Sequence, residues 1–419
     1  MPPKRIESLR FPVFGIAWSP SMLVYCGGGG SSKSGIGNSI VIANHSNHSN
    51  TDEHAVGTKS SVIIDTGDEI CVGIGIRHDA ESPPPHILAA IGDEVRLYDS
   101  VSGSLLGSIM CHKDFKGVNC VAFSVDGSRV IAGCEGGSVL LFSLKWNTEK
   151  TKVDFEMVAE CAGHAKAVCA VSFPPVEGAF QCLSSAKDGT ARVWDERSGA
   201  EIGRLACSIA EPGKPPAKKN AQVLVRGCCY DAQGLIYTVA SGRKGSAYLA
   251  KWQAQPHPQQ PQALHYVQIE RKCVSKVPIS AMNMSGDRST LAFGNVSGSI
   301  ILLRADTLQV IKTFEEVHDL PVTCIAAKPL HSLAGEEADA ISASADSKLV
   351  FFSTKREPRS LWIDFWCFLL LVFFAFSFKF SHDQCRTELL AVDMDDLRQC
   401  VVASLMAPIS QPGILIIPH

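Results

Sequence analysis

The sequence lacks the cysteine pattern of a zinc-binding protein. None of its 16 cysteines forms a C-x-x-C pair with another, which is the spacing that structural zinc sites commonly use. Most of them lie inside apolar runs, such as Cys120 in VNCVAFS and Cys324 in VTCIAAK. We interpret the cysteines as small core residues of a protein in a reducing compartment.

The sequence also lacks an excess of positive charge and an apolar N-terminal segment. Its 39 lysines and arginines stand against 42 aspartates and glutamates, a net charge of −3, which argues against a strongly basic surface for nucleic acid. The opening MPPKRIESLRFPVFG contains no apolar run of signal-peptide length. We therefore expect the body of the protein to lie in the cytosol and to bind no nucleic acid.

Convincing amphipathic helices are missing, and a repeated strand pattern takes their place. Seven segments carry apolar residues at their first, fourth and sixth positions, and they start at residues 13, 71, 118, 168, 225, 279 and 322. Most lead into two further strand-like runs joined by a tight Gly, Asn or Asp turn, as in VIAGCEGGSVLLFSL. The 43 to 58 residues between successive starts match the period of WD-repeat blades with loop insertions.

One repeat carries the full WD signature. Gly163 and His164 precede a strand, and Trp194 and Asp195 end a later one. We expect Asp188 to reach back to His164, with Trp194 packed beneath both, as a structural network and not a catalytic one. The fold class is therefore an all-β, seven-bladed WD-repeat β-propeller, with the N-terminal KRIESLR supplying the outer strand that blade 7 lacks.

Three polar stretches interrupt the pattern. Residues 44–60 form an insertion whose His45, His48 and His54 could bind a metal, although a solvated loop is the better interpretation. Residues 211–220 and 254–262 are rich in proline, lysine and glutamine, and they are interpreted as surface connections.

A dense apolar run follows the last blade. Residues 361–380 read LWIDFWCFLLLVFFAFSFKF, in which only Asp364 and Lys379 are charged. The run has nearly the length of a bilayer span, and a buried strand or helix of the propeller is the alternative. The predicted organisation is a cytosolic propeller over residues 1–357, a single transmembrane helix over 358–380 and a short lumenal tail over 381–419.

Residues 26–38, CGGGGSSKSGIGN, have the composition of a phosphate-binding loop. A P-loop would need a glycine at the position of Ser32 and a helix after the loop, but the following NSIVIAN is strand-like. The dinucleotide pattern fails at Ile40, where it needs a third glycine. We therefore do not expect the chain itself to bind a nucleotide.

The place of this loop in the fold is more informative. It joins the second and third strands of blade 1 through about eleven residues, where the other blades use two to four. Bare carbonyl groups in such a loop can ligate a hard cation. On composition alone, a simple turn insertion is an equally good interpretation.

The pattern GGGG-x4-G-[IV]-x-N at this turn of a membrane-anchored propeller resembles one family. This family comprises the guanine nucleotide exchange factors that activate Sar-type small GTPases on the endoplasmic reticulum, including the animal prolactin regulatory element-binding protein. The matching residues are Gly27, Gly28, Gly29, Gly30, Gly35, Ile36 and Asn38, and Lys33 fits the animal form.

The resemblance implies a regulator of a GTPase, without covalent chemistry, that starts coat complex II vesicle budding at the endoplasmic reticulum membrane. Its loop would hold a potassium ion through Gly29, Gly30 and Asn38 and would press on the GTPase. Ile36 would act as an apolar wedge, and Asn38 would hydrogen-bond across the interface or pin the loop.

One departure keeps an alternative open. Gly37 stands where fungal and plant members tend to have a proline that stiffens the loop. A plant relative, the phosphate transporter traffic facilitator, resembles the exchange factors without clear exchange activity. The alternative function is thus an exchange-inactive protein that helps phosphate transporters or other cargo leave the endoplasmic reticulum.

Overall fold

A computed structural model of the chain describes residues 5–30, 34–44, 61–77, 85–149, 151–176, 178–210, 222–257, 260–330 and 338–354. The chain divides into two compact units, Met1–Thr354 and Lys355–His419, and every described residue lies in the first. The predicted anchor at 358–380, the tail at 381–419, most of the 44–60 insertion with its three histidines, and the 211–220 stretch lie outside the described residues. Within those ranges, no helix is long and apolar enough to cross a membrane.

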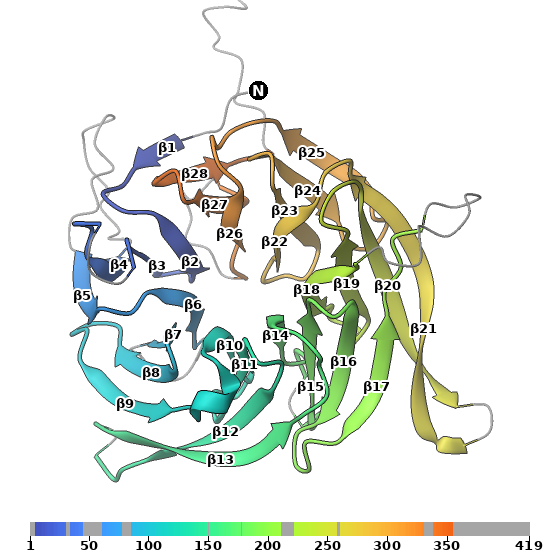
Figure 1. Ribbon diagram of the computed structural model, residues 1–419, viewed down its shortest axis with the longest axis horizontal. Coiled ribbons are helices and arrows are strands. Elements are labelled where there is room, and N and C mark those ends of the chain that lie inside the picture. The colour runs from blue at the N-terminus through green and yellow to red at the C-terminus, as the bar shows by residue number, and fades with distance from the viewer. Residues whose placement is uncertain are drawn as a thin grey trace, which may run out of the picture. The chain divides into compact units, whose positions relative to one another are not determined.

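The described part of the first unit is a ring of seven four-stranded antiparallel sheets, as the repeat pattern predicted (Figure 1). Blade 1 contains β2 (Val13–Trp18), β3 (Met22–Gly27), β4 (Asn38–Asn44) and β5 (Ser61–Gly67). Blade 2 contains β6 (Cys71–Ile76), β7 (His86–Ile91), β8 (Glu94–Asp99) and β9 (Leu105–Met110). Blade 3 contains β10 (Val118–Phe123), β11 (Arg129–Cys134), β12 (Val139–Trp146) and β13 (Val153–Cys161).

Blades 4 and 5 contain β14 (Val168–Ser172), β15 (Gln181–Ala186), β16 (Thr190–Asp195) and β17 (Glu201–Ala206), then β18 (Leu224–Tyr230), β19 (Ile236–Ser241), β20 (Ala247–His257) and β21 (Gln260–Ser275). Blades 6 and 7 contain β22 (Ile279–Met284), β23 (Thr290–Asn295), β24 (Ile300–Arg304) and β25 (Val310–Phe314), then β26 (Val322–Ala327), β27 (Ala340–Ser344), β28 (Lys348–Phe352) and β1 (Arg5–Ser8). Between β9 and β10 lies a short 3-10 helix, Lys113–Phe115.

A bulge at the same place in every blade explains the unusual apolar spacing of the inner strands. In all seven, the register with the second strand shifts shortly after the strand begins, as between Val13 and Gly15 or between Val322 and Cys324. Because a bulge adds one residue, the first and fourth positions of the strand come to face the same side. Apolar residues at positions one, four and six therefore all pack between blades.

The core of the ring lies between the blades. Seven clusters of buried apolar side chains are found among the described residues, and each one joins two neighbouring sheets. The cluster between blades 1 and 7, for example, contains Val13 and Trp18 from β2 together with Ile341 and Leu349. Each blade is thus stabilised by the burial of both its faces, mainly through the hydrophobic effect.

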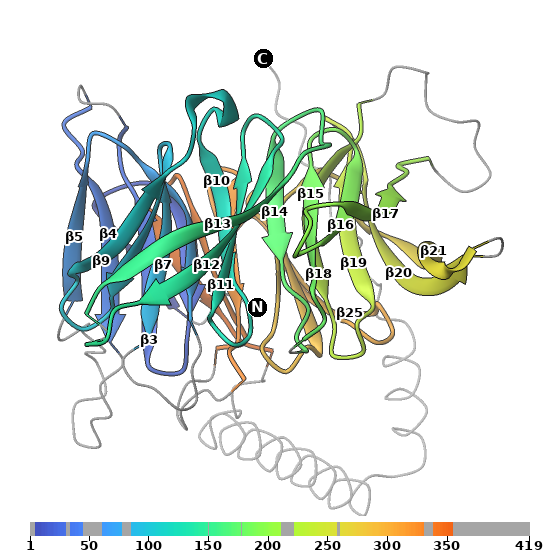
Figure 2. The same ribbon diagram turned by 90° about the horizontal axis from the view of Figure 1, so that it is seen from below.

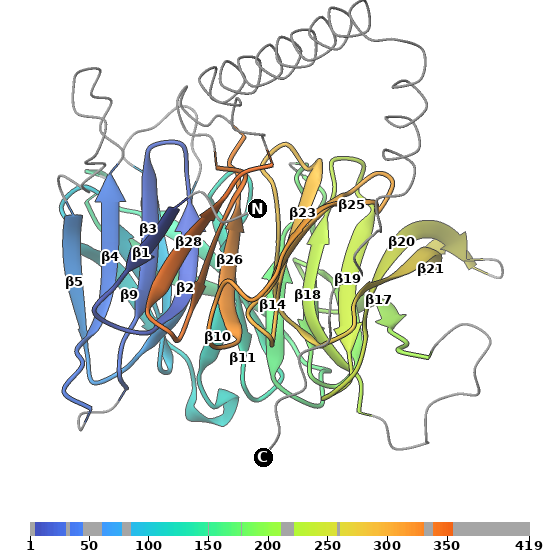
Figure 3. The same ribbon diagram turned by 90° about the horizontal axis from the view of Figure 1, so that it is seen from above.

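The ring closes through both ends of the unit, as predicted. β1 pairs with β28 in an antiparallel register that runs from Arg5 opposite Phe351 to Ser8 opposite Lys348. The N-terminal strand therefore completes blade 7, and β28 has no exposed edge along this stretch. Figures 2 and 3 show the blades from the side, with the four strands of each sheet standing next to one another.

The interpretation of residues 254–262 as a surface connection was wrong. β20 and β21 continue as a paired hairpin to His257 and Gln260, and this hairpin projects beyond the other blades (Figures 1 and 2). β20 loses its other neighbour after Trp252. Pro256, opposite Leu264, therefore lies where one side of the strand has no ladder to donate to, so proline is tolerated there.

Deletion of residues 1–9 should destabilise the propeller. The deletion removes the four paired residues of β1 and leaves the edge of β28 open. We expect the free energy of unfolding to fall by about 2–4 kcal/mol, at about 0.5–1 kcal/mol for each backbone hydrogen bond lost. Urea denaturation checks this, with deletion of residues 1–3 as the control. Equal midpoints for the two deletions would show that β1 does not hold the ring closed.

The glycine-rich loop of blade 1 as candidate functional site

The candidate site is the turn between β3 and β4, which spans residues 28–37. In the other blades the equivalent turn has two to five residues, so this one is by far the longest. Gly27 pairs with Val13 at the start of β2, which places the turn at the end of the ring where the inner strands begin. Residues 31–33, and with them Lys33, lie outside the described residues.

The first leg of the loop runs against the backbone before β2. The N–H of Gly28 donates to the carbonyl oxygen of Pro12 at 3.0 Å. A Cβ atom at Gly27 would lie 1.9 Å from that same oxygen, so no side chain fits there. Gly28 and Gly30 have φ angles of 149° and 81°, which glycine adopts readily and other residues rarely do. These glycines are thus required by close packing and backbone shape.

The side chain of Asn38 connects the two legs of the loop at its base. Its side-chain oxygen accepts the N–H of Gly30 at 3.0 Å, and its amide nitrogen donates to the carbonyl oxygens of Gly30 at 3.3 Å and Gly67 at 2.9 Å. The residue is 3% exposed. The structure therefore places Asn38 under the loop, where it ties the loop to β5, and not on the outer surface.

The two legs of the loop also lie close together beyond the hydrogen bonds of Asn38. A Cβ at Gly29 would lie 2.0 Å from the Ser34 hydroxyl oxygen and 2.9 Å from the Cβ of Ile36. The Ser34 hydroxyl accepts the N–H of Ile36 at 3.2 Å. Gly29 thus lets the returning leg pass close by, and this contact holds the backbone of Ile36.

The returning leg of the loop carries an apolar side chain in an open setting. Ile36 is 37% exposed, and a Cβ atom added at either of its neighbours, Gly35 or Gly37, would meet nothing within 4 Å. An aliphatic side chain flanked by two unhindered glycines can meet another protein without steric conflict from its own neighbours.

The loop base also offers oxygen ligands suited to a hard cation. The carbonyl oxygen of Gly30 and the side-chain oxygen of Asn38 each take part in one hydrogen bond, which leaves each a further lone pair. The carbonyl of Gly29 accepts no hydrogen bond from a described residue. Potassium prefers such neutral oxygens. Among the described residues, no group of three or more His, Cys, Asp or Glu could hold a metal ion.

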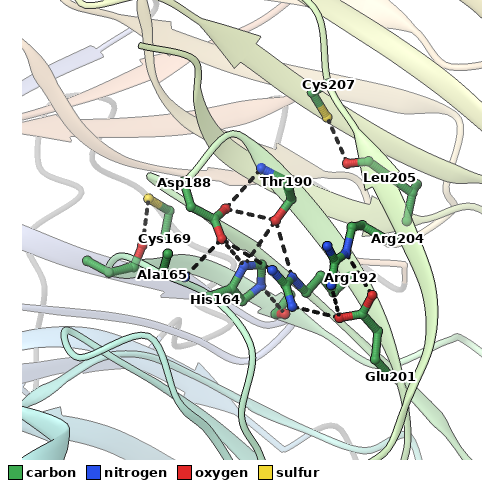
Figure 4. Close-up of polar contacts among 12 residues, drawn as sticks. His164, Ala165, Cys169, Asp188, Thr190, Arg192, Glu201, Arg204, Leu205 and Cys207 are labelled. Carbon is green, nitrogen blue, oxygen red and sulfur yellow. Dashed lines mark hydrogen bonds and ion pairs between the residues drawn. The ribbon is translucent and has the colours of Figure 1, made fainter.

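The structure brings His164, Asp188 and Trp194 into one hydrogen-bonded chain in blade 4. Figure 4 shows the contacts of His164 with Asp188 and Thr190. His164 Nδ1 lies 3.0 Å from Asp188 Oδ2, its Nε2 lies 2.8 Å from the Ser184 hydroxyl, and Trp194 Nε1 donates to that hydroxyl at 2.8 Å. Burial alone would raise the pKa of Asp188. Hydrogen bonds from His164 and Thr190 have the larger, opposite effect, so the pKa lies well below its ordinary value. The chain is buried and internally satisfied, which suits a structural role.

Blade 7 contains a second chain of this kind, which the sequence reasoning missed. His318 Nδ1 lies 3.0 Å from Asp346 Oδ2, and its Nε2 lies 2.7 Å from the Ser342 hydroxyl. Burial lowers the pKa of His318, although the neighbouring Asp346 carboxylate acts in the opposite direction. Phe352 occupies the place of the tryptophan, so the motif is incomplete. The spacing of His318 and Asp346 across β26 and β27 was the signal that could have found it.

The fold and this loop define a WD-repeat propeller with an enlarged, glycine-rich turn in blade 1. In line with this, residues 103–143 and 155–195 match the WD domain, G-beta repeat family. A solved structure described as the crystal structure of mitotic checkpoint complex has the same fold. Its chain superimposes with a TM-score of 0.59 at 13% identity, over 84% of this chain and 91% of that one.

The sequence is similar to SEC12-like protein 2 of Arabidopsis thaliana. The two are 24% identical over 240 residues, which cover 54% of this chain and 49% of the relative. The match thus spans about half the length of the curated relative. Together with the WD repeats, it supports the resemblance to the Sec12 family of WD-repeat proteins that the loop motif indicated.

Substitution of Gly27 by alanine should destabilise the propeller, whereas alanine at Gly37 should be harmless. The added methyl group collides with the Pro12 carbonyl in the first case and meets open space in the second. We expect Gly27→Ala to lower the free energy of unfolding by about 1–3 kcal/mol, the usual cost of overpacking. Urea denaturation of both variants checks this, and equal losses would contradict it.

Asp346→Ala should unfold the protein more easily than its neighbour Asp319→Ala. Asp346 accepts from His318 and from the backbone N–H of Asp319, whereas the Asp319 side chain is exposed. Loss of the buried acceptor should cost about 1–3 kcal/mol, whereas loss of the exposed pair should have little effect because water already solvates both charges. Thermal and urea melts measure the difference. A smaller loss of stability in Asp346→Ala than in Asp319→Ala would show that this network does not stabilise blade 7.

Proposed function

We propose that the protein is a guanine nucleotide exchange factor for a Sar-type small GTPase at the endoplasmic reticulum membrane, where it initiates coat complex II vesicle budding. The observation that carries the proposal is the ten-residue turn of blade 1, clamped at its base by Asn38 and open around Ile36 on its returning leg. The similarity to a protein named SEC12-like supports the same function.

In the proposed mechanism, the ring acts as a rigid platform and the loop acts on the GTPase. Ile36 inserts as an apolar wedge, with Gly27, Gly28, Gly29, Gly30, Lys33 and Gly35 forming the rest of the GTPase-binding loop. Asn38 is a positioning residue, because it holds the loop base and does not reach its surface. Exchange follows if the loop binds the nucleotide-free GTPase more tightly than the loaded form.

A potassium ion bound by oxygens of Gly29, Gly30 and Asn38 would stiffen the loop base further. Its ligands would be the two backbone carbonyl groups and the asparagine side-chain oxygen, with no charge from the protein. The proposal also includes a single membrane anchor at residues 358–380 with the propeller in the cytosol and residues 381–419 in the lumen. Such an anchor would raise the effective concentration of the protein next to a membrane-bound GTPase.

A second candidate function follows from Gly37. Gly35 and Gly37 both lie in open space on the returning leg of the loop, so this leg is less constrained than one with a proline at position 37 would be. A less constrained segment loses more conformational entropy when it binds, which lowers its affinity. The second candidate is therefore an exchange-inactive protein of the same membrane that helps phosphate transporters or other cargo to leave it.

A nucleotide-release assay separates the two candidates. The full chain in detergent micelles should speed the release of a fluorescent guanine nucleotide from a purified Sar-type GTPase. Ile36→Ala should lower the catalysed rate by at least about tenfold, since the wedge is lost while the fold is untouched. Asn38→Ala should lower it through loop disorder, visible as faster hydrogen exchange over residues 28–37.

The ion dependence is measured in the same assay. If the loop base binds potassium, replacement of potassium by sodium should reduce the rate of the wild type and should have less effect on Asn38→Ala. Val158→Ala, which removes a similarly exposed aliphatic side chain from the outer strand β13 of blade 3, is the matched control. A wild-type protein that leaves the release rate at its uncatalysed value would favour the second candidate, and normal rates in Ile36→Ala would remove the wedge from the mechanism.

A further inference from the structure

A second feature lies at the same end of the ring as the glycine-rich loop. A pocket of about 300 Å³ opens where blades 4, 5 and 6 meet. Its walls come from the beginnings of β18 and β22 and from the turns that follow β15, β19 and β23. These are the same strand ends that carry the glycine-rich loop in blade 1, so the loop and the pocket share one face of the propeller.

The pocket and the loop stand on opposite sides of this face. The inner strands contact one another in the order of the blades around a closed ring, so blades 4 and 5 are the two farthest from blade 1. Figure 1 shows β2 and β18 on opposite sides of the ring. A partner that covers this face and touches the loop would therefore reach the pocket with a different part of its surface.

The pocket is lined by cations and contains no carboxylate. Lys187, Arg226 and Arg243 line it, and none of its lining residues is an aspartate or a glutamate. Lys187 pairs with Glu135 outside the pocket at 3.7 Å, and Arg243 Nε donates to the Gln222 side chain at 3.1 Å.

Arg226 is the most notable of the three. It is half-buried on the inner strand β18, where its guanidinium contacts the thiol of Cys169. No carboxylate within the described residues pairs with Arg226 or Arg243. A partly desolvated guanidinium group gains a strong, charge-assisted hydrogen bond when it meets an anion, so an acidic group from outside the chain would complete the pocket.

A buried hydroxyl group in the wall gives independent support. Ser241, at the end of β19, lines the pocket and is 1% exposed. Its Oγ has no hydrogen-bond partner among the described residues. A buried hydroxyl without a partner costs free energy, and such groups are uncommon in native proteins. An oxygen-bearing ligand could accept its hydrogen bond.

The loops around the pocket extend its positive charge. Lys166, Lys244 and Lys276 are exposed at this end of blades 4 and 5, and Asp188 between them is engaged by His164 and Arg192. On the other blades, the loops at this end carry the exposed cations Arg10 and Lys116 among a larger number of exposed acids: Glu69, Asp93, Asp114, Glu135, Glu315, Glu316 and Asp319. The cations therefore form a sector and not a uniform coat, which favours one orientation of an acidic partner.

We propose that this pocket is a binding site for carboxylate side chains of an acidic segment on the protein that docks against the glycine-rich loop. The inference rests on the proposed function in one respect, since there the docking protein is the small GTPase. Arg226 and Arg243 bind the carboxylate, Ser241 donates a hydrogen bond to it, and the surrounding lysines steer the segment toward the pocket. The loop and the pocket together fix the orientation of the partner on this face.

A charged peptide tests the pocket itself. The full chain in detergent micelles is titrated into fluorescein-labelled octaglutamate, and fluorescence anisotropy gives the affinity over a series of salt concentrations. We expect saturable, salt-sensitive binding that is weakened at least about tenfold in Arg226→Gln/Arg243→Gln. Arg243→Gln alone should weaken binding as well, and this exposed side chain can be replaced without risk to the fold.

The matched control removes two cations at the other end of blades 5 and 6. Lys251 and Arg304 line a separate, larger pocket there, together with several carboxylates. Lys251→Gln/Arg304→Gln has the same net charge as the test variant and should bind the peptide like the wild type. No binding by the wild type, or equal weakening in both double variants, would overturn the proposal.

The nucleotide-release assay tests whether the GTPase is the protein that binds this pocket. In the nucleotide-release assay, Arg226→Gln/Arg243→Gln should slow association with the GTPase by about tenfold at low salt and less at high salt, with Ile36 intact. If the wild type speeds release and this variant does so equally well, the GTPase is not the occupant and the proposal fails while the exchange function stands. If the wild type does not speed release but the peptide binds as expected, the exchange function fails and the acidic-segment site stands.

Discussion

Closure of the ring is the constraint on which the rest of this structure depends. Each blade buries both faces against its neighbours, so blades 1 and 7 are fully buried only because they meet. The pairing of β1 with β28 and the apolar cluster between blades 1 and 7 make that contact from residues more than 300 positions apart. Because the closing strand comes from the N-terminus, blade 1 and its long turn lie next to the seam.

The stiffness of the ring gives the glycine-rich loop a defined position. A glycine-rich turn in isolation would sample many conformations and would lose much entropy on ordering. Here Gly27 and Gly28 are packed against Pro12, and the Asn38 side chain spans three peptide groups from two segments. The base of the loop is therefore held by the sheet, and the side chain of Ile36 stays open to a partner. A loop with a fixed base and an open apolar side chain is suited to insert against another protein.

The two ends of the ring differ in chemistry. The end that carries the glycine-rich loop also has the carboxylate-free pocket of Lys187, Arg226 and Arg243. The larger pocket at the other end of blades 5 and 6 mixes cations with Asp231, Asp287 and Asp306. Balanced charges satisfy one another, whereas an unmatched cluster favours an external anion. The distribution of charge thus points to the same face as the loop does.

Much of this architecture could be predicted from local sequence. The apolar spacing of the inner strands, the turn residues and the WD signature around His164 and Trp194 together predicted seven blades, and the KRIESLR segment predicted how they close. The pattern worked because each strand is buried on both faces and short turns need particular backbone shapes. Prediction failed for residues 254–262, where prolines suggested a connection although the chain forms a hairpin.

What the sequence by itself determined is the type and order of the elements, because periodicity and turn chemistry act between residues close in the chain. Only the tertiary structure decided that Asn38 faces inward to clamp the loop and that Lys187, Arg226 and Arg243 meet in one pocket. These groupings join residues from different strands or different blades. Their partners are set by how the sheets pack around the ring, and no spacing along the chain encodes that geometry.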